Sequence, residues 1–130
     1  MARPVMADAD VLLDFAAGAG AASSVRRLIR AGRLVVSSMV FHELWRGAES
    51  EADREELRRL LAGVPVVWFT RQDAEGAASI WQHLTGHQRE LVGDRDLLIA
   101  GTALARGWPV LTRNRRHFKL TGVELADLSA

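Results

Sequence analysis

The sequence of 130 residues contains no cysteine, no tyrosine and a single lysine, Lys119. Without cysteine, neither a disulfide framework nor a thiolate metal site can form. The longest apolar stretches, such as residues 64–69, are far shorter than the roughly 20 residues that a membrane-spanning helix needs. The N-terminal residues lead into a strand-like run and do not resemble a signal peptide, so we expect a cytoplasmic protein.

The overall composition is that of an ordinary compact protein. Hydrophobic residues make up 48% and charged residues 25%, and the length suits one domain over residues 1–130. The net charge of +1 is too small to predict nucleic-acid binding by itself. The arginines cluster early, at 26, 27, 30 and 33, where they fit either phosphate contacts or a solvated helix face.

Short apolar runs alternate with helical patterns along the chain. We expect strands at 5–9, 34–36, 66–69 and 110–111, with a final strand at 123–125. The expected helices begin near residue 10, at Ser23 or Ser24, at 37–38, at 50, at Thr70 or Asp73, and at 94. The fifth of these should run to about residue 87, and Gly86 and Gly93 should bracket a loop before the helix at 94–106. This alternation predicts an α/β fold with a mostly parallel sheet of four or five strands.

Three acids stand at the start or the buried border of these elements. Asp8 closes the first strand, where a carboxylate needs a cation or hydrogen-bond donors; it can equally cap the following helix. Glu43 alone would be a solvated surface acid, and Asp94 or Asp96 alone would serve the positive end of a helix. Together, Asp8, Glu43 and Asp96 predict a carboxylate site for Mg²⁺ or Mn²⁺. The four histidines lack the paired spacing of a zinc site.

Four segments resemble the PIN-domain ribonucleases, in particular the toxins of VapBC toxin–antitoxin pairs. Residues 8–14 are similar to the family's D-T-[ND]-V-L-I-D start, and residues 43–48 match its E-L-x-x-G-A. Residues 96–104 resemble D-x-x-I-A-A-x-A-L, and residues 110–118 resemble L-V-T-x-[ND]-x-x-x-F. Each segment alone is weak, but the four occur in the family's order over nearly the whole chain.

The resemblance implies a PIN-like three-layer α/β/α fold and a metal-dependent endoribonuclease that cuts RNA phosphodiester bonds, with transfer RNA as a family-level substrate. It carries the metal-binding role to Asp8, Glu43 and Asp96, with Mg²⁺ or Mn²⁺ as the cofactor. It also implies a VapB-like antitoxin as partner, in a homodimer or a toxin–antitoxin hetero-oligomer.

The sequence departs from the family pattern near the expected site. Ala9 replaces the usual hydroxyl residue, and Asn114 stands where some members carry a fourth acid. His117 precedes the aromatic residue in place of an acid. Asn114 or Thr112 is then expected to orient a water or a carboxylate, whereas Asp94 is a weaker source of the missing charge because residues two apart on a helix face different sides.

Two other functions are compatible with an acidic α/β domain of this length. A PIN fold that binds nucleic acid without cleaving it would keep metal affinity but lack activity. A receiver-type phosphoacceptor domain needs an aspartate after the third strand and a lysine after the fifth. The third expected strand runs instead into Phe69 and Thr70, and the one lysine follows the fourth, so this alternative is disfavoured.

Overall fold

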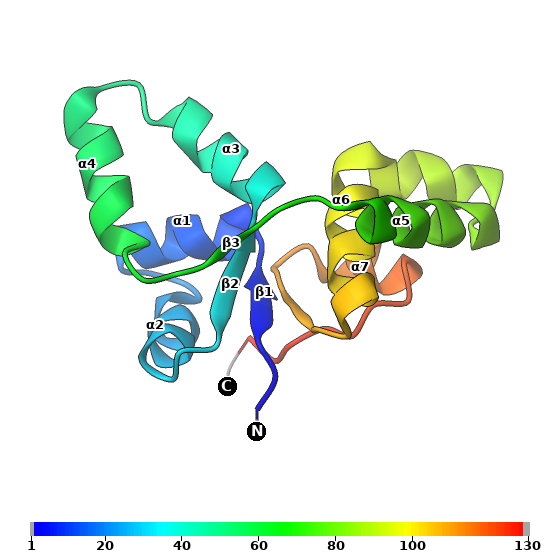
Figure 1. The fold of residues 1–130 in the computed structure, drawn as a ribbon, viewed down its shortest axis with the longest axis horizontal. Coiled ribbons are helices and arrows are strands. Elements are labelled where there is room, and N and C mark those ends of the chain that lie inside the picture. The colour runs from blue at the N-terminus through cyan, green and yellow to red at the C-terminus, as the bar shows by residue number, and fades with distance from the viewer. Residues whose placement is uncertain (1, 129–130) are drawn as a thin grey trace.

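The computed structural model describes residues 2–128, in which short strands alternate with helices (Figure 1). The first half contains β1 (Val5–Ala7), α1 (Ala9–Ala17), α2 (Ala22–Arg30), β2 (Leu34–Ser37), α3 (Ser38–Gly47) and α4 (Glu51–Leu60). The second half contains β3 (Val66–Val67), α5 (Arg71–His83), α6 (Gly86–Arg106), β4 (Val110–Leu111) and α7 (Arg115–Leu120).

The four strands form one parallel sheet in the order β3-β2-β1-β4. β1 lies in the middle, and its Met6 is in register with Val35 of β2 and Val110 of β4. Helices α1 and α2 lie on one side of the sheet and α5, α6 and α7 on the other (Figure 1). The expected three-layer α/β/α fold is confirmed, and the carboxyl ends of the strands meet at one edge, where α/β sheets place their ligand sites.

The core explains why the strands are continuous apolar runs. A strand covered on both faces has no polar side, and every residue of β1 and β4 is buried. Ile99 and Ala100 of α6 and Phe118 of α7 are fully buried in the same cluster. Phe118 is therefore a packing residue that holds α7 against the sheet layer.

Three helices begin with serine or threonine caps where the sequence predicts a helix start. The side chains of Ser37, Ser50 and Thr70 each accept a hydrogen bond from a backbone N–H in the first turn of their helix. The prediction for α2 is wrong, because Ala21 caps that helix and Ser24 lies inside it. The Ser24 hydroxyl donates instead to the carbonyl of Leu128.

The predicted loop between Gly86 and Gly93 is wrong, because this segment is helical. Thr85 and Gln88 form a reciprocal capping box that starts α6 at Gly86, while α5 ends at His83 rather than at residue 87. The helix is interrupted at Gly93, which has φ 73° and ψ 164°, a conformation open to glycine. The helix predicted at 94–106 is thus the part of α6 that follows this kink.

The remaining boundary differences are small. β1 ends at Ala7 and β3 at Val67, so both are shorter than predicted. The predicted strand at 123–125 is a single bridge between Val110 and Leu125, and α7 was not predicted. No helix within residues 2–128 combines the length and the apolar character needed to cross a membrane.

Candidate metal site at the carboxyl edge of the sheet

Asp8 stands at the end of the central strand and is almost completely buried. Its Oδ1 accepts a hydrogen bond from the N–H of Ala9 at 2.7 Å, so the residue does cap α1. Its Oδ2 accepts a hydrogen bond from the Thr112 hydroxyl at 2.7 Å, and Oδ1 also contacts a guanidinium. The two alternatives for Asp8 are therefore compatible, because a cap and a charge partner use the same carboxylate.

The segment after β4 positions two further predicted residues. The Thr112 hydroxyl, which donates to Asp8, also accepts a hydrogen bond from the N–H of Asn114 at 3.0 Å. The Asn114 amide then donates to Asp96 Oδ2 at 2.9 Å. A chain of hydrogen bonds thus joins Asp8, which follows β1, to Asp96 of α6 through the loop between β4 and α7.

Glu43 and Asp96 reach the same edge from helices on opposite sides of the sheet. Asp96 is buried in α6, three residues after the kink, and Glu43 is half-buried in α3. Asp94, two residues earlier, is exposed. The structure brings together Asp8, Glu43, Asp96, Thr112 and Asn114 and leaves Asp94 outside.

Arg95 lies at the centre of the three predicted metal ligands. Its Nε donates to Glu43 Oε2 at 2.8 Å, its Nη1 to Asp96 Oδ1 at 2.6 Å and its Nη2 to Asp8 Oδ1 at 2.5 Å. The three acids therefore converge on one cation, which in this structure is a guanidinium, whereas the sequence predicts a metal ion for them. Within residues 2–128, no three acid or histidine side chains are positioned to hold a metal ion as they stand.

The electrostatics of the site show an excess of buried negative charge. Burial raises the pKa of Asp96. The positive charge and hydrogen bond of Arg95 act to lower this pKa, and the negative charge of Asp8 acts to raise it further. Burial and the charge of Asp8 also raise the pKa of Asp10, which lies two residues further along the chain. Burial disfavours the charged form of Arg95, but the hydrogen bonds to Glu43 and Asp8 outweigh it and raise its pKa.

The donor set fits a hard divalent cation. Four carboxylates and one amide group lie around the site, and oxygen ligands of this kind are those that Mg²⁺ and Mn²⁺ select. Two buried carboxylate oxygens, Glu43 Oε1 and Asp10 Oδ1, have no hydrogen-bond partner among the described residues. Such oxygens are costly unless a further charge or donor reaches them. The side chains thus suit a metal ion, provided that Arg95 leaves their centre.

Sequence reasoning missed three residues at this edge. The sequence patterns assign no role to Arg95 and place only a helix start near Asp10. Asp10 Oδ2 accepts a hydrogen bond from the N–H of Arg113 at 2.9 Å. His117 was seen only as a departure from the pattern, yet its Nδ1 lies 4.0 Å from Asp96 Oδ2. The one sequence signal for Arg95 is its position between Asp94 and Asp96, which places a positive charge beside an expected metal ligand.

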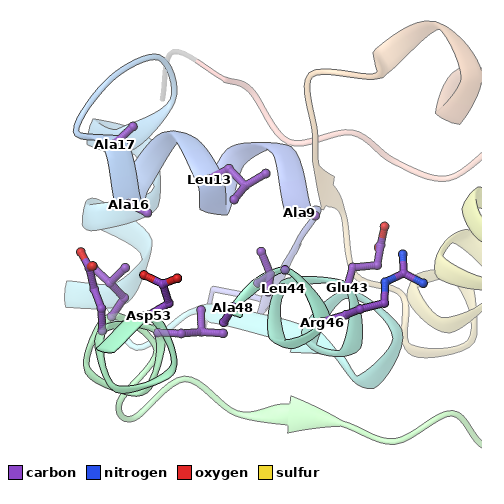
Figure 2. A pocket seen from close by; sticks show the side chains of 13 residues that line it. Ala9, Leu13, Ala16, Ala17, Glu43, Leu44, Arg46, Ala48 and Asp53 are labelled. Carbon is purple, nitrogen blue, oxygen red and sulfur yellow. The ribbon is translucent and has the colours of Figure 1, made fainter. Parts of the chain in front are cut away.

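A largely apolar pocket of about 630 Å³ begins beside this site. Helices α1 and α3 face each other across it, with Leu13 and Leu44 pointing inward and Glu43 at the end nearest Ala9 (Figure 2). Leu57 and Leu60 of α4 complete the apolar lining. Leu13 is 58% exposed, so the pocket presents a large apolar side chain to solvent.

Fold, strand order and acid cluster together define a PIN domain. The family model for the PIN domain matches residues 5–123, and the chain belongs to this family. Within the family it is similar to VapC proteins. It is 25% identical over 115 residues to Ribonuclease VapC1 of Methanocaldococcus jannaschii, covering 88% of this chain and 79% of that protein.

Solved structures agree with this placement. A chain of the DNA-bound VapBC from Salmonella typhimurium is 26% identical, with a TM-score of 0.79 over 98% of this chain and 99% of the other. A chain of VapBC2 from Rickettsia felis, bound to a fragment of promoter DNA, has the same TM-score at 21% identity and covers 94% and 96%. At 21% identity, the similarity to the Rickettsia felis chain supports the fold alone.

Proposed function

We propose that the chain is a metal-dependent endoribonuclease and the toxin of a type II toxin–antitoxin pair. The observation that carries the proposal is the convergence of Asp8, Glu43 and Asp96 on one cation at the carboxyl edge of a PIN-domain sheet. Membership of the PIN family and the likeness to a protein named as a ribonuclease support the reaction class.

Asp8, Glu43 and Asp96 would hold Mg²⁺ or Mn²⁺, which supplies a hydroxide nucleophile near neutral pH and offsets charge on the scissile phosphate and the leaving oxygen. Asp8 is the best-oriented ligand, because Ala9 and Thr112 fix its two oxygens. Asn114 holds Asp96 by an amide hydrogen bond, which is the orienting role expected of it. Glu43 keeps Oε1 unpaired for a ligand.

The proposed partner is a VapB-like antitoxin, in keeping with the toxin–antitoxin complexes among similar structures. The pocket between α1, α3 and α4 offers apolar side chains next to Glu43, so a polypeptide lying there would also cover the acid cluster. Exposed apolar surface of this kind is typical of an interaction site. We propose assembly as a hetero-oligomer with the antitoxin, built on a homodimer of this chain.

The test is cleavage of a pool of cellular RNA by the purified chain, with transfer RNA as the first defined substrate. Discrete fragments should appear with Mg²⁺ or Mn²⁺ and be absent in EDTA. Asp8→Asn, Glu43→Gln and Asp96→Asn should abolish them, while Asp94→Asn, which removes an exposed acid outside the cluster, should cleave like the wild type.

Circular dichroism must show that each variant is folded. Normal cleavage by all three of these folded variants would place the active site elsewhere. No cleavage by folded wild-type protein that binds Mn²⁺ would favour a PIN domain that binds nucleic acid without cutting it, a reading consistent with Asn114 in place of a fourth acid.

A further inference from the structure

We propose that Arg95 is a built-in counter-ion that competes with the divalent metal ion for the carboxylates of Asp8, Glu43 and Asp96. The inference rests on the metal site proposed above. It adds that metal loading is an exchange of one cation for another, in which a side chain of the same chain must leave.

The geometry shows that the guanidinium is fully engaged with the three acids. Each of its three nitrogens donates to a different carboxylate, at 2.5 to 2.8 Å. Arg113, another arginine close to this edge, pairs through its side chain with Asp14. Within residues 2–128, Arg95 is therefore the only arginine or lysine that pairs with these three acids, and His117 adds positive charge beside Asp96 only when it is protonated.

The same carboxylate oxygens cannot serve both cations. Asp8 Oδ1, Asp96 Oδ1 and Glu43 Oε2 all point at the guanidinium, and a divalent ion held between these acids would occupy its place. A metal ion and the guanidinium held between the same acids would also repel each other, because both are positively charged. Binding of the metal and retention of the three Arg95 contacts therefore exclude each other.

The charge balance favours the metal once it is present. Three carboxylates face a single positive charge in the metal-free protein, and a divalent ion compensates them more completely. Arg95 neighbours Asp96 in the chain, so it competes at a fixed effective concentration that dilution cannot reduce. The apparent metal affinity is then lower than the intrinsic one by the fraction of molecules in which Arg95 has left.

The structure leaves room for Arg95 to leave. Its side chain is 39% exposed, so it reaches solvent without opening the core. A pocket of about 410 Å³ lies beside it, lined by Ser38, Met39, His42, Glu43, Arg46 and Arg95 itself. Arg95 lies on α6 two residues after the kink at Gly93, and we expect a change of its side-chain rotamer to carry the guanidinium into this space.

The first experiment is a calorimetric titration of the full chain with Mn²⁺. Arg95→Gln should bind Mn²⁺ about tenfold more tightly than the wild type, since no internal cation has to be displaced. Arg46→Gln is the matched control: it removes one positive charge from the same pocket, but Arg46 is exposed and makes no ion pair within residues 2–128. It should change the affinity by less than about threefold, as expected for a screened charge.

The second experiment observes Arg95 directly and does not depend on the stability of a variant. In EDTA, the Nε–H of wild-type Arg95 should give a resolved NMR cross-peak that exchanges slowly with water, because Nε donates to Glu43. Saturating Mg²⁺ should remove this protection. Arg95→Lys identifies the peak by its loss.

The outcomes separate the inference from the proposed function. Tighter Mn²⁺ binding by Arg95→Gln together with loss of the protected Nε–H in Mg²⁺ supports the exchange. Equal affinities of wild type and Arg95→Gln, or a protected Nε–H that persists at saturating Mg²⁺, overturn it while leaving the metal site intact. Absence of Mn²⁺ binding by both folded proteins overturns the metal site and the exchange together.

Discussion

The Thr112 hydroxyl donates a 2.7 Å hydrogen bond to Asp8 Oδ2, so the ends of β4 and β1 are joined by side chains as well as by the sheet. Both residues are buried, and the same hydroxyl accepts the N–H of Asn114. This contact orients the central carboxylate of the proposed metal site.

Replacing Thr112 with valine should therefore affect stability and the site together. Valine keeps the shape but leaves a buried carboxylate oxygen and a backbone N–H without their partner, which costs about 1–3 kcal/mol. Urea unfolding in EDTA measures the loss, and Thr112→Ser, which retains the hydroxyl, should lose less. A Thr112→Val protein as stable as the wild type would show that the bond makes no net contribution.

The contribution of Asp10 and Asp96 to the stability of the metal-free protein should fall as the pH rises above the ordinary carboxyl pKa of about 3.9. The pKa values of Asp10 and Asp96 are raised in the folded protein, mainly by burial, so the folded state binds more protons than the unfolded state in that window. The stabilisation from these two carboxyl groups is fully present below their pKa in the unfolded state. It is lost as the pH rises through their higher pKa in the folded state.

Asp10→Asn isolates one part of this effect. Its amide oxygen can still accept the N–H of Arg113, but it carries no charge beside Asp8. Urea unfolding in EDTA from pH 4 to pH 7 should show a shallower decline than in the wild type, and the variant should be at least as stable at pH 7. A steeper decline, or a loss of stability at pH 7, would contradict the assigned cause.

Gly101→Ala should disrupt the packing of α5 on α6. A Cβ at this position would lie 2.6 Å from the Ala77 nitrogen and 2.7 Å from the Asp73 carbonyl oxygen, both of them backbone atoms that cannot rotate away. Overpacking of this kind costs about 1–3 kcal/mol. Thermal unfolding measures this loss as a lower Tm. In the same assay Gly86→Ala, which lies in the first turn of the same helix with open space around it, should be neutral or slightly stabilising.

Arg106→Gln should be the most destabilising of these changes. Asp73 is 1% exposed, and its Oδ1 is 2.5 Å from Arg106 Nη1. Removing one partner of a buried pair leaves an uncompensated charge, at a cost of about 3–5 kcal/mol. Adding Asp73→Asn should recover part of this loss in chemical unfolding, and a double variant worse than either single one would argue against the pair as the cause.

The elements that position the site could be predicted because their signals are local. The apolar runs at β1, β2 and β4 mark buried strands, and the residue after each strand lies at the carboxyl edge whatever the details of packing. This is why Asp8 and Thr112 could be placed from the sequence. The position of Asp96 in the first turn of a helical segment could be predicted because Gly93 marks the start of that segment.

The position of Arg95 could not be predicted in this way. Its three partners lie 87, 52 and 1 residues away in the chain, so its role depends on how α3, α6 and β1 meet. The helical segment after Thr85 was missed for a local reason, because two glycines outweighed a capping box whose partners are threonine and glutamine.

The place of β1 in the middle of the sheet has a consequence for synthesis. Its first neighbour, β2, begins at Leu34, but its second, β4, begins only at Val110 and is translated much later. Asp96, Thr112 and Asn114 emerge equally late, and pairings of such sequence separation form slowly. A ribosome that has translated only the first half of these residues therefore holds no assembled acid cluster, and the site can form only after residue 114 has been added.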